Sequence, residues 1–274
     1  MQEGISFMCS SEVPVVMLNV SRGGPGVGGI QPGQADYFQA TRGGGNGDYH
    51  VPVFAPASIQ EAIDMIYGAF EIADKYQNPV MILADGMLGQ MMEPVSLPEA
   101  KRMATYEEIR ANKPWAITGK GPRSERNVIK SLRLQPDVLE AHIHRLFEKY
   151  DRMEKELVRY ETYGEPDPEI VFVAFGTVAR LVAETMDILA ERGYKAGMIR
   201  PVTLWPFPFD AFARISDKTR LVVSVELSMG QLLTDVKAAV CGRVPVGLIN
   251  RTGGVVPTPV EIADRAIKQL KALD

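Results

Sequence analysis

The residue of this sequence with the clearest chemical potential is an arginine at the start of a glycine-rich run. Arg22 follows an apolar stretch over 13–20 that predicts a strand, and ten glycines lie between positions 23 and 47. Backbone with so few side chains can approach a charged ligand or another chain closely. An arginine at the carboxyl end of a strand suits bidentate binding of a carboxylate, and it equally suits an ordinary salt bridge. The pattern therefore predicts either a ligand site or a structural ion pair at Arg22.

Three glycines of this run match the dinucleotide-binding fingerprint G-x-G-x-x-G, at Gly24, Gly26 and Gly29. That fingerprint must open a helix whose amino terminus receives the pyrophosphate, whereas Ile-Gln-Pro-Gly at 30–33 continues the loop. No second predicted strand ends in an acidic residue at the distance that the motif requires. A dinucleotide site of this kind is therefore disfavoured.

Four other polar residues are candidates for a functional role. Asp36, Asp48 and His50 lie close to the glycines, and we expect them to cap the glycine turns. Glu226 ends a later predicted strand, where it could be catalytic or could cap the turn that follows over 228–230.

The cysteine content limits the redox chemistry of the chain. Cys9 and Cys241 are the only cysteines, and their distance in sequence predicts two buried thiols in a reducing compartment. An iron–sulfur cluster normally takes four thiolates, so this chain alone cannot hold one. The three histidines show no metal-ligand spacing together with these cysteines, and no metal site is predicted.

Composition and charge narrow the class of protein. With 274 residues, 46% hydrophobic and 23% charged, the chain has the composition of a folded globular protein. A net charge of −4 provides no basic surplus for phosphates, so no nucleic-acid partner is expected. No apolar run is long enough for a membrane span, and the first residues lack the layout of a signal peptide. We therefore expect a cytoplasmic protein.

Hydrophobic periodicity predicts alternating strands and helices. The first half contains strands at 51–55 and 79–83 around a helix over 59–76 capped by Ser58, and later a long helix over 136–163. The second half contains βα units at 170–175 with 178–192, 195–200 with 209–215 and 221–225 with 231–240, then a strand at 245–249 and a helix at 259–273. Such alternation predicts an α/β fold with a parallel sheet covered on both faces.

The strongest break in this pattern is Gly-Glu-Pro-Asp-Pro at 164–168, because two prolines and a glycine interrupt both helix and strand. We predict an α/β domain over 1–112, an irregular excursion and long connecting helix over 113–165, and a second α/β domain over 166–274.

Two parts of the sequence carry a resemblance to a known family. The first reads Asn-Val-Ser-Arg-Gly-Gly-Pro-Gly at 19–26 and continues through 34–41 to Gly-Gly-Gly-Asn-Gly-Asp-Tyr at 43–49. The second contains Phe-Gly-Thr at 175–177 and Arg-Pro-Val-Thr-Leu-Trp-Pro-Phe-Pro at 200–208. With these segments the chain resembles the α subunits of 2-oxoacid:ferredoxin oxidoreductases, most closely the branched-chain (2-oxoisovalerate) type.

The resemblance implies a partial thiamine-diphosphate pyrimidine-binding domain followed by a transketolase C-terminal-like domain. It implies oxidative decarboxylation of a 2-oxoacid to acyl-CoA and carbon dioxide, with electrons passed to ferredoxin. Thiamine diphosphate and Mg²⁺ would lie at the interface with a β subunit, γ and δ subunits would complete the enzyme, and the [4Fe-4S] clusters would belong to partner chains. In that scheme Arg22 binds the carboxylate of the substrate, and Arg22, Gly23 and Gly24 face the cofactor.

The start of the chain departs from the family pattern. Members of the family carry a further segment ahead of the strand at 13–20, with a Tyr-Pro-Ile-Thr-Pro-like loop and a glutamate that hydrogen-bonds the aminopyrimidine. Neither Glu3 nor Glu12 matches the setting of that glutamate. We therefore expect an N-terminally shortened chain that is inactive alone. A non-catalytic α/β module that binds a nucleotide or a partner chain is the alternative hypothesis.

Overall fold

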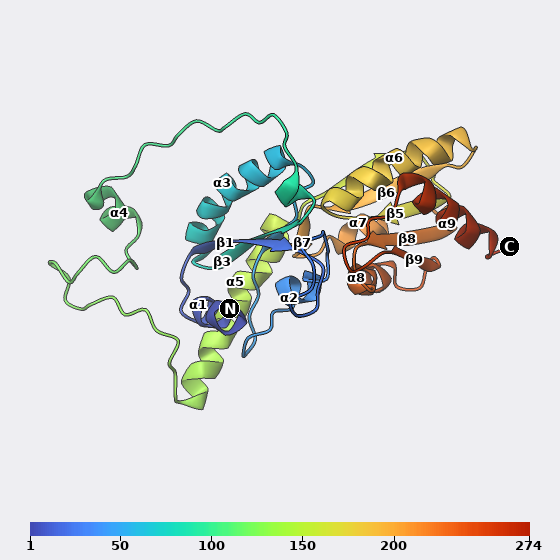
Figure 1. Cartoon of the computed structure of the whole chain (residues 1–274). Helices are drawn as coiled ribbons and strands as arrows, with labels where there is room; N and C mark the ends of the chain where they lie inside the picture. The colour runs from blue at the N-terminus through green and yellow to red at the C-terminus, as the bar shows by residue number, and fades with distance from the viewer.

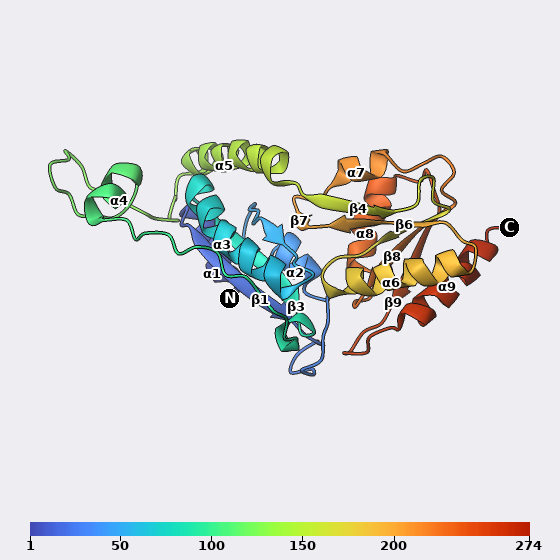
Figure 2. The same ribbon diagram turned by 90° about the horizontal axis from the view of Figure 1, so that it is seen from above.

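The computed structural model describes residues 1–274, which form two sheets arranged end to end, as Figures 1 and 2 show. The first sheet has four strands in the order β1-β3-β2-β7, and the second has five in the order β4-β6-β5-β8-β9. Helices cover both sheets, so the mixed α/β architecture is the predicted one.

The first sheet is built on a parallel pair. Strands β1 (Val15–Ser21) and β3 (Pro79–Asp85) pair over seven residues, and β2 (Val53–Phe54) continues the sheet in parallel beyond β3. Helix α3 (Ile59–Tyr76) packs against this sheet and begins where predicted, because the Ser58 side chain accepts a hydrogen bond from the Glu61 amide. Helix α1 (Gln2–Ser10) precedes β1.

The fourth strand of the first sheet comes from the second half of the chain. Strand β7 (Thr203–Trp205) pairs antiparallel with β2, an element that the sequence did not predict. The two sheets therefore do not divide the chain at a single point, and the residue limits given above for the domains stay a prediction.

The second sheet follows the predicted βα alternation. Strands β5 (Ile170–Val173), β6 (Ala196–Pro201), β8 (Leu221–Glu226) and β9 (Val246–Asn250) are parallel. Figure 2 shows helices α6 (Thr177–Glu191) and α9 (Pro259–Lys271) together on one face, with α7 (Phe209–Ala213) and α8 (Gln231–Val240) on the other. Helices on both faces explain why most residues of these four parallel strands are apolar.

The long helix is shorter than predicted. Helix α5 (Pro136–Leu157) ends at Leu157, and residues predicted to continue it form β4 (Tyr160–Gly164), the antiparallel edge strand of the second sheet. Five cross-strand partners on β6, which periodicity along the chain cannot reveal, favour the extended conformation here.

Residues 91–135 form an irregular segment whose middle part projects from the body (Figure 1), and it begins earlier than the excursion predicted from residue 113. They follow a short 3₁₀ turn, η1 (Leu88–Gln90), and contain one small helix, α4 (Tyr106–Asn112). A capping box between Thr105 and Glu108 starts this helix.

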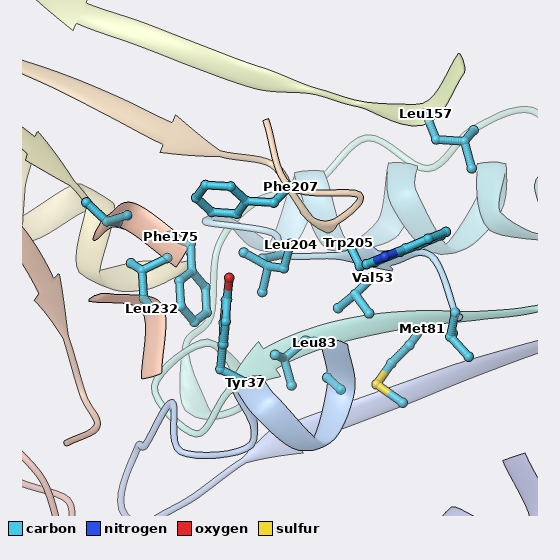
Figure 3. Packing of buried hydrophobic residues seen from close by; sticks show 14 of the residues in the cluster. Tyr37, Val53, Met81, Leu83, Leu157, Phe175, Leu204, Trp205, Phe207 and Leu232 are labelled. Atoms are coloured by element: carbon cyan, nitrogen blue, oxygen red, sulfur yellow. The ribbon is translucent and has the colours of Figure 1, made fainter. Parts of the chain in front are cut away.

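One hydrophobic cluster joins the two halves. A cluster of 27 buried residues includes side chains from both sheets, and Figure 3 shows Tyr37 beside Phe175 of the second half, with ring centroids 5.7 Å apart. Tyr37 begins helix α2 (Tyr37–Thr41), which interrupts the glycine-rich run. The sequence predicted one continuous glycine loop, whereas the structure has two glycine turns separated by a buried helix.

Candidate functional site

The carboxyl ends of strands from both sheets meet at one junction, beside the first glycine turn. The loop after β1 packs on the loop after β9: a Cβ atom on Gly23 would lie 3.1 Å from the carbonyl carbon of Gly253. A Cβ atom on Gly254 would overlap Gln31 in the first loop. Close approach of the two backbones thus requires glycine on both sides, and it places the turn where α/β sheets bind ligands.

Arg22 is held by the turn that it opens. Its Nη1 donates hydrogen bonds to the carbonyl oxygens of Gly29 at 3.2 Å, Gly23 at 3.3 Å and Val27, and its Nη2 donates to Gly26 at 3.3 Å. All four acceptors are neutral, and the residue is exposed. The alternative of an ordinary salt bridge is therefore wrong for this chain, and Arg22 retains a charge that no carboxylate neutralises.

The turn itself depends on two further glycines. Gly28 has a φ of +52°, and a Cβ atom there would overlap the carbonyl oxygen of Gly23. A Cβ atom on Gly33 would lie 2.8 Å from the carbonyl oxygen of Arg22. The carbonyl groups can therefore converge on the guanidinium only because these positions have no side chain.

Gln34 fixes the end of this turn to the second sheet. Its backbone amide donates to the carbonyl oxygen of Leu227 at 2.9 Å, and its Oε1 accepts from the Leu227 amide at 3.0 Å. Its Nε2 donates to the carbonyl oxygen of Phe175 at 3.0 Å, and the residue is only 2% exposed. The sequence contained no signal for this role, because both partners lie more than a hundred residues away.

Asp85 makes the second connection between the halves. Its Oδ2 accepts from the Thr177 hydroxyl at 2.5 Å and from the Thr177 amide at 3.4 Å, at the amino terminus of α6. Its Oδ1 accepts from the amides of Met87 and Leu88 at 3.0 and 3.1 Å. Gly176, at φ +60°, leaves room for this contact, because a Cβ atom there would lie 3.3 Å from Asp85 Oδ2. A carboxylate at a helix amino terminus is electrostatically favourable.

Glu226 has a capping role, which was one of its two predicted roles. The carboxylate is 1% exposed and accepts hydrogen bonds from the Ser224 hydroxyl at 2.9 Å and from the Ser228 hydroxyl. It also accepts from the amides of Leu232 and Leu233 at 3.0 Å each, in the first turn of α8. With four donors from its own chain, Glu226 caps that helix.

The three polar residues expected to cap glycine turns differ in their surroundings. His50 stacks on Trp205 with ring centroids 4.6 Å apart and an interplanar angle of 10°, so the predicted cap is wrong for this residue. Burial lowers the pKa of His50, and the charge of Asp48 opposes that shift. Asp36 Oδ2 accepts from the Asn19 side chain at 3.2 Å, which joins β1 to the start of α2, and Asp48 is exposed.

A separate cleft of about 700 Å³ lies beside the second glycine turn. Its lining includes His50, Trp205, Lys155 and an ion pair between Arg42 Nη2 and Asp235 Oδ1 at 2.5 Å. The Tyr37 hydroxyl also donates to Asp235, at 2.5 Å. Unlike Arg22, Arg42 is therefore neutralised by a carboxylate of the second half.

The cysteines sit in two different environments. Cys9 is buried, and burial raises its pKa to about 12, partly opposed by the charge of Lys149. Cys241 is exposed, so the prediction of two buried thiols is wrong for it. No group of three or more His, Cys, Asp or Glu side chains is arranged to hold a metal ion. None of the helices combines the length and the apolar character that crossing a membrane requires.

The junction exposes mainly backbone and one cation, and it buries one hydroxyl. Ser21 ends β1, is 1% exposed, and its Oγ has no hydrogen-bond partner. The buried carboxylates of Asp85 and Glu226 are both bound by donors of this chain. Of the three consecutive residues predicted to face the cofactor, Arg22 and Gly24 are exposed at this junction, and Gly23 is buried against the loop after β9.

Comparison with known proteins identifies the class. Residues 1–162 match the family described as pyruvate flavodoxin/ferredoxin oxidoreductase, thiamine-diphosphate-binding, and residues 168–262 match pyruvate:ferredoxin oxidoreductase core domain II. The chain is 44% identical over 253 residues to ketoisovalerate oxidoreductase subunit VorB of Methanothermobacter marburgensis, covering 92% of this chain and 70% of the relative. It is 37% identical to 2-oxoglutarate synthase subunit KorA of Archaeoglobus fulgidus, covering 89% and 69%.

A solved structure has the same fold. The 2-oxoglutarate:ferredoxin oxidoreductase from Magnetococcus marinus, determined with 2-oxoglutarate, coenzyme A and succinyl-CoA bound, superimposes with a TM-score of 0.79 at 23% identity. The match covers 98% of this chain and 51% of that chain. The chain belongs to the 2-oxoacid:ferredoxin oxidoreductase family. The resemblance noted in the sequence is thereby confirmed, and a subunit of a thiamine-diphosphate-dependent oxidoreductase is favoured over a non-catalytic module.

Proposed function

We propose that this chain is the α-type subunit of an enzyme that oxidatively decarboxylates a branched-chain 2-oxoacid to acyl-CoA, and that Arg22 binds the substrate carboxylate. The observation that carries the proposal is the exposed guanidinium of Arg22, which lies at the carboxyl end of β1 without a carboxylate partner. The branched-chain substrate rests on the similarity to the ketoisovalerate oxidoreductase subunit.

Each residue of the junction has a distinct part in this proposal. Arg22 supplies the positive charge that orients the acid, and its fixed position in the turn reduces the entropy lost on binding. Gly24, with open space at its Cβ position, lets the cofactor approach the backbone, and Gly23 lets the loop after β9 pack beside it. Gln34 and Asp85 act as positioning residues, because they hold the turn against the second sheet. Thiamine diphosphate, when bound, supplies the nucleophilic carbon that the protein itself lacks.

The other components belong to partner chains in this proposal. A β subunit holds the diphosphate and Mg²⁺, γ and δ subunits complete the assembly, and ferredoxin accepts the electrons. This division fits a chain with two cysteines in different environments and no metal-binding cluster. Coenzyme A binds to the assembled enzyme in this proposal, as it does in the solved 2-oxoglutarate:ferredoxin oxidoreductase.

The test uses the complex assembled with its partner subunits and thiamine diphosphate. We expect Arg22→Ala to lower kcat/KM for 2-oxoisovalerate about 10- to 100-fold, because a charge-assisted hydrogen bond contributes roughly 1.5–3 kcal/mol. Arg22→Lys keeps the charge but not the planar fork, so its loss should be smaller.

Arg192→Ala is the matched control, since Arg192, directly after α6, forms a surface ion pair with Asp264 of α9 at 2.6 Å, outside the junction. Its kcat/KM should stay within about twofold of wild type because exposed ion pairs contribute little. An Arg22→Ala enzyme with unchanged kcat/KM would remove Arg22 from the substrate site.

A further inference from the structure

A concentration of positive charge lies at the end of the first sheet that is opposite to Arg22. A cavity of about 370 Å³ is lined by Glu12, shortly before β1 begins, and by Gln77, shortly before β3 begins. The first glycine turn, with Arg22, lies at the carboxyl ends of these strands. Seven strand residues span about 20 Å, so this cavity is remote from the junction described above.

The projecting segment supplies most of the charge at this cavity. Residues 110–133 contain seven Lys or Arg and one Glu, a net charge of +6, which leaves −10 on the remainder of a chain whose total is −4. Arg126, Lys130 and Arg133 of this segment line the cavity, together with Arg145 of α5. Four cations of a protein with a net negative charge thus surround this one cavity.

The single carboxylate in the lining is already used. Glu12 forms ion pairs with Arg145 Nη2 at 2.7 Å and with the buried Lys149 Nζ at 3.3 Å. Burial raises the pKa of Glu12, but these two cations outweigh burial and leave the pKa below its ordinary value. Glu12 is therefore ionised and neutralised by these two partners, and it leaves the other cations of the cavity without a counter-charge.

The three cations that the projecting segment contributes to the cavity have no acidic partner within 4 Å. Arg133 Nη1 donates only to carbonyl oxygens, those of Lys130 at 3.2 Å, Ser131 at 3.4 Å and Ser10 at 3.5 Å. Burial lowers the pKa of Arg133, and the positive charge of Arg145 lowers it further, against the opposing charge of Glu12. A bound anion would relieve this repulsion.

The half-buried ring of Trp115 lines the same cavity. We propose that this cavity binds the phosphate groups of a small phosphorylated molecule, with Arg126, Lys130 and Arg133 around the phosphate oxygens. Phosphate suits this lining better than a single carboxylate does, since arginine forks pair with its several oxygens and three unneutralised cations match its multiple negative charge. Trp115 is positioned to contact an attached ring.

The test is isothermal titration calorimetry of the full chain with inorganic pyrophosphate and with ADP, each at about 1 mM. The variant Arg126→Gln/Lys130→Gln removes two exposed cations whose side chains make no hydrogen bond in the structure, so folding should be preserved. Lys237→Gln/Lys268→Gln, on the exposed surfaces of α8 and α9, removes the same charge elsewhere.

We expect both probes to bind, and the Arg126→Gln/Lys130→Gln variant to bind about tenfold or more weakly, with the control variant unchanged. If a nucleotide is the ligand, Trp115→Ala should lower the affinity for ADP and leave the affinity for pyrophosphate unchanged. Equal affinities of the wild-type chain for both probes would indicate a site for phosphate groups alone, which is still the proposed chemistry. Absence of binding by either probe would overturn the proposal. An equal loss in the control variant would also overturn it, because it would reduce the effect to net charge.

Discussion

The two glycine turns of this chain each have an arginine at their start, and the arginines differ in what surrounds them. Arg22 donates to four carbonyl oxygens and has no carboxylate partner. Arg42 pairs with Asp235 and lies over the Phe38 ring, 4.3 Å from its centroid. Two turns of similar composition thus differ: Arg22 has a charge available to a ligand, and Arg42 has a charge that is used in an internal ion pair.

The glycines of the two turns differ in the same way. In the second turn, a Cβ atom on Gly45 would lie 2.6 Å from the carbonyl oxygen of Gln2, so this turn packs on α1. Its backbone is further held by Tyr49, whose hydroxyl oxygen accepts from the amides of Gly44 and Gly45 at 3.3 and 3.1 Å. We infer that the second turn joins structural elements, while the first forms a wall of the site.

Among variants of the two turns, Gly28→Ala should cause the largest loss of kcat/KM. The new Cβ atom would overlap the Gly23 carbonyl oxygen at a positive φ, and the carbonyls that hold Arg22 would have to move. A displacement of about 1 Å in a positioning group can cost about 100-fold in rate, so we expect a loss of that size in kcat/KM of the assembled enzyme.

The matched control is Gly26→Ala in the same turn. It has a similar φ of +68° but open space around the new Cβ atom, so backbone strain is present without the overlap. Equal activity of the two variants would mean that the positions of these carbonyls do not matter to the site.

Asp235→Ala tests the structural role of the second arginine. It leaves the buried Tyr37 hydroxyl unpaired and removes the partner of Arg42, so the free energy of unfolding should fall by about 1–3 kcal/mol. Chemical denaturation measures this loss, and kcat/KM of the folded enzyme should change little.

Arg42→Ala should lower stability by less than about 1 kcal/mol, since the Arg42 side chain is 43% exposed. A large kcat/KM loss with either variant would place the second turn in the site.

Gly47→Ala should affect stability alone. The position has a φ of +91° but open space around a Cβ atom, so only the backbone conformation is penalised, by about 1–2 kcal/mol of unfolding free energy. Thermal unfolding of the purified chain measures that change. Loss of activity without loss of stability would contradict the structural role of this turn.

Features determined by neighbouring residues could be predicted from the sequence. The limits of α3 and α8 follow from periodicity and, for α3, from the Ser58 cap, and Arg22 does lie just past β1. The capping role of Glu226 could be foreseen because the turn and helix that it caps follow it directly.

Features that depend on distant partners could not be predicted. Strand β7 has three residues and exists because β2 lies beside it, and β4 replaces the end of a predicted helix because β6 provides cross-strand partners. The role of Gln34 depends on Leu227 and Phe175, and the position of His50 depends on Trp205. These contacts are set by how the two halves pack, which local patterns do not encode.

The most direct test of the central claim is chemical rescue of the two arginine variants. Methylguanidinium, added to assembled Arg22→Ala enzyme, should enter the space left by the side chain and restore part of kcat/KM for 2-oxoisovalerate in a saturable manner. The same addition should not change Arg42→Ala enzyme. Two results would contradict the assignment of the carboxylate-binding charge to Arg22. One is an increase in kcat/KM of the Arg42→Ala enzyme on addition of methylguanidinium. The other is an Arg22→Ala enzyme that has lost activity and does not regain it on that addition.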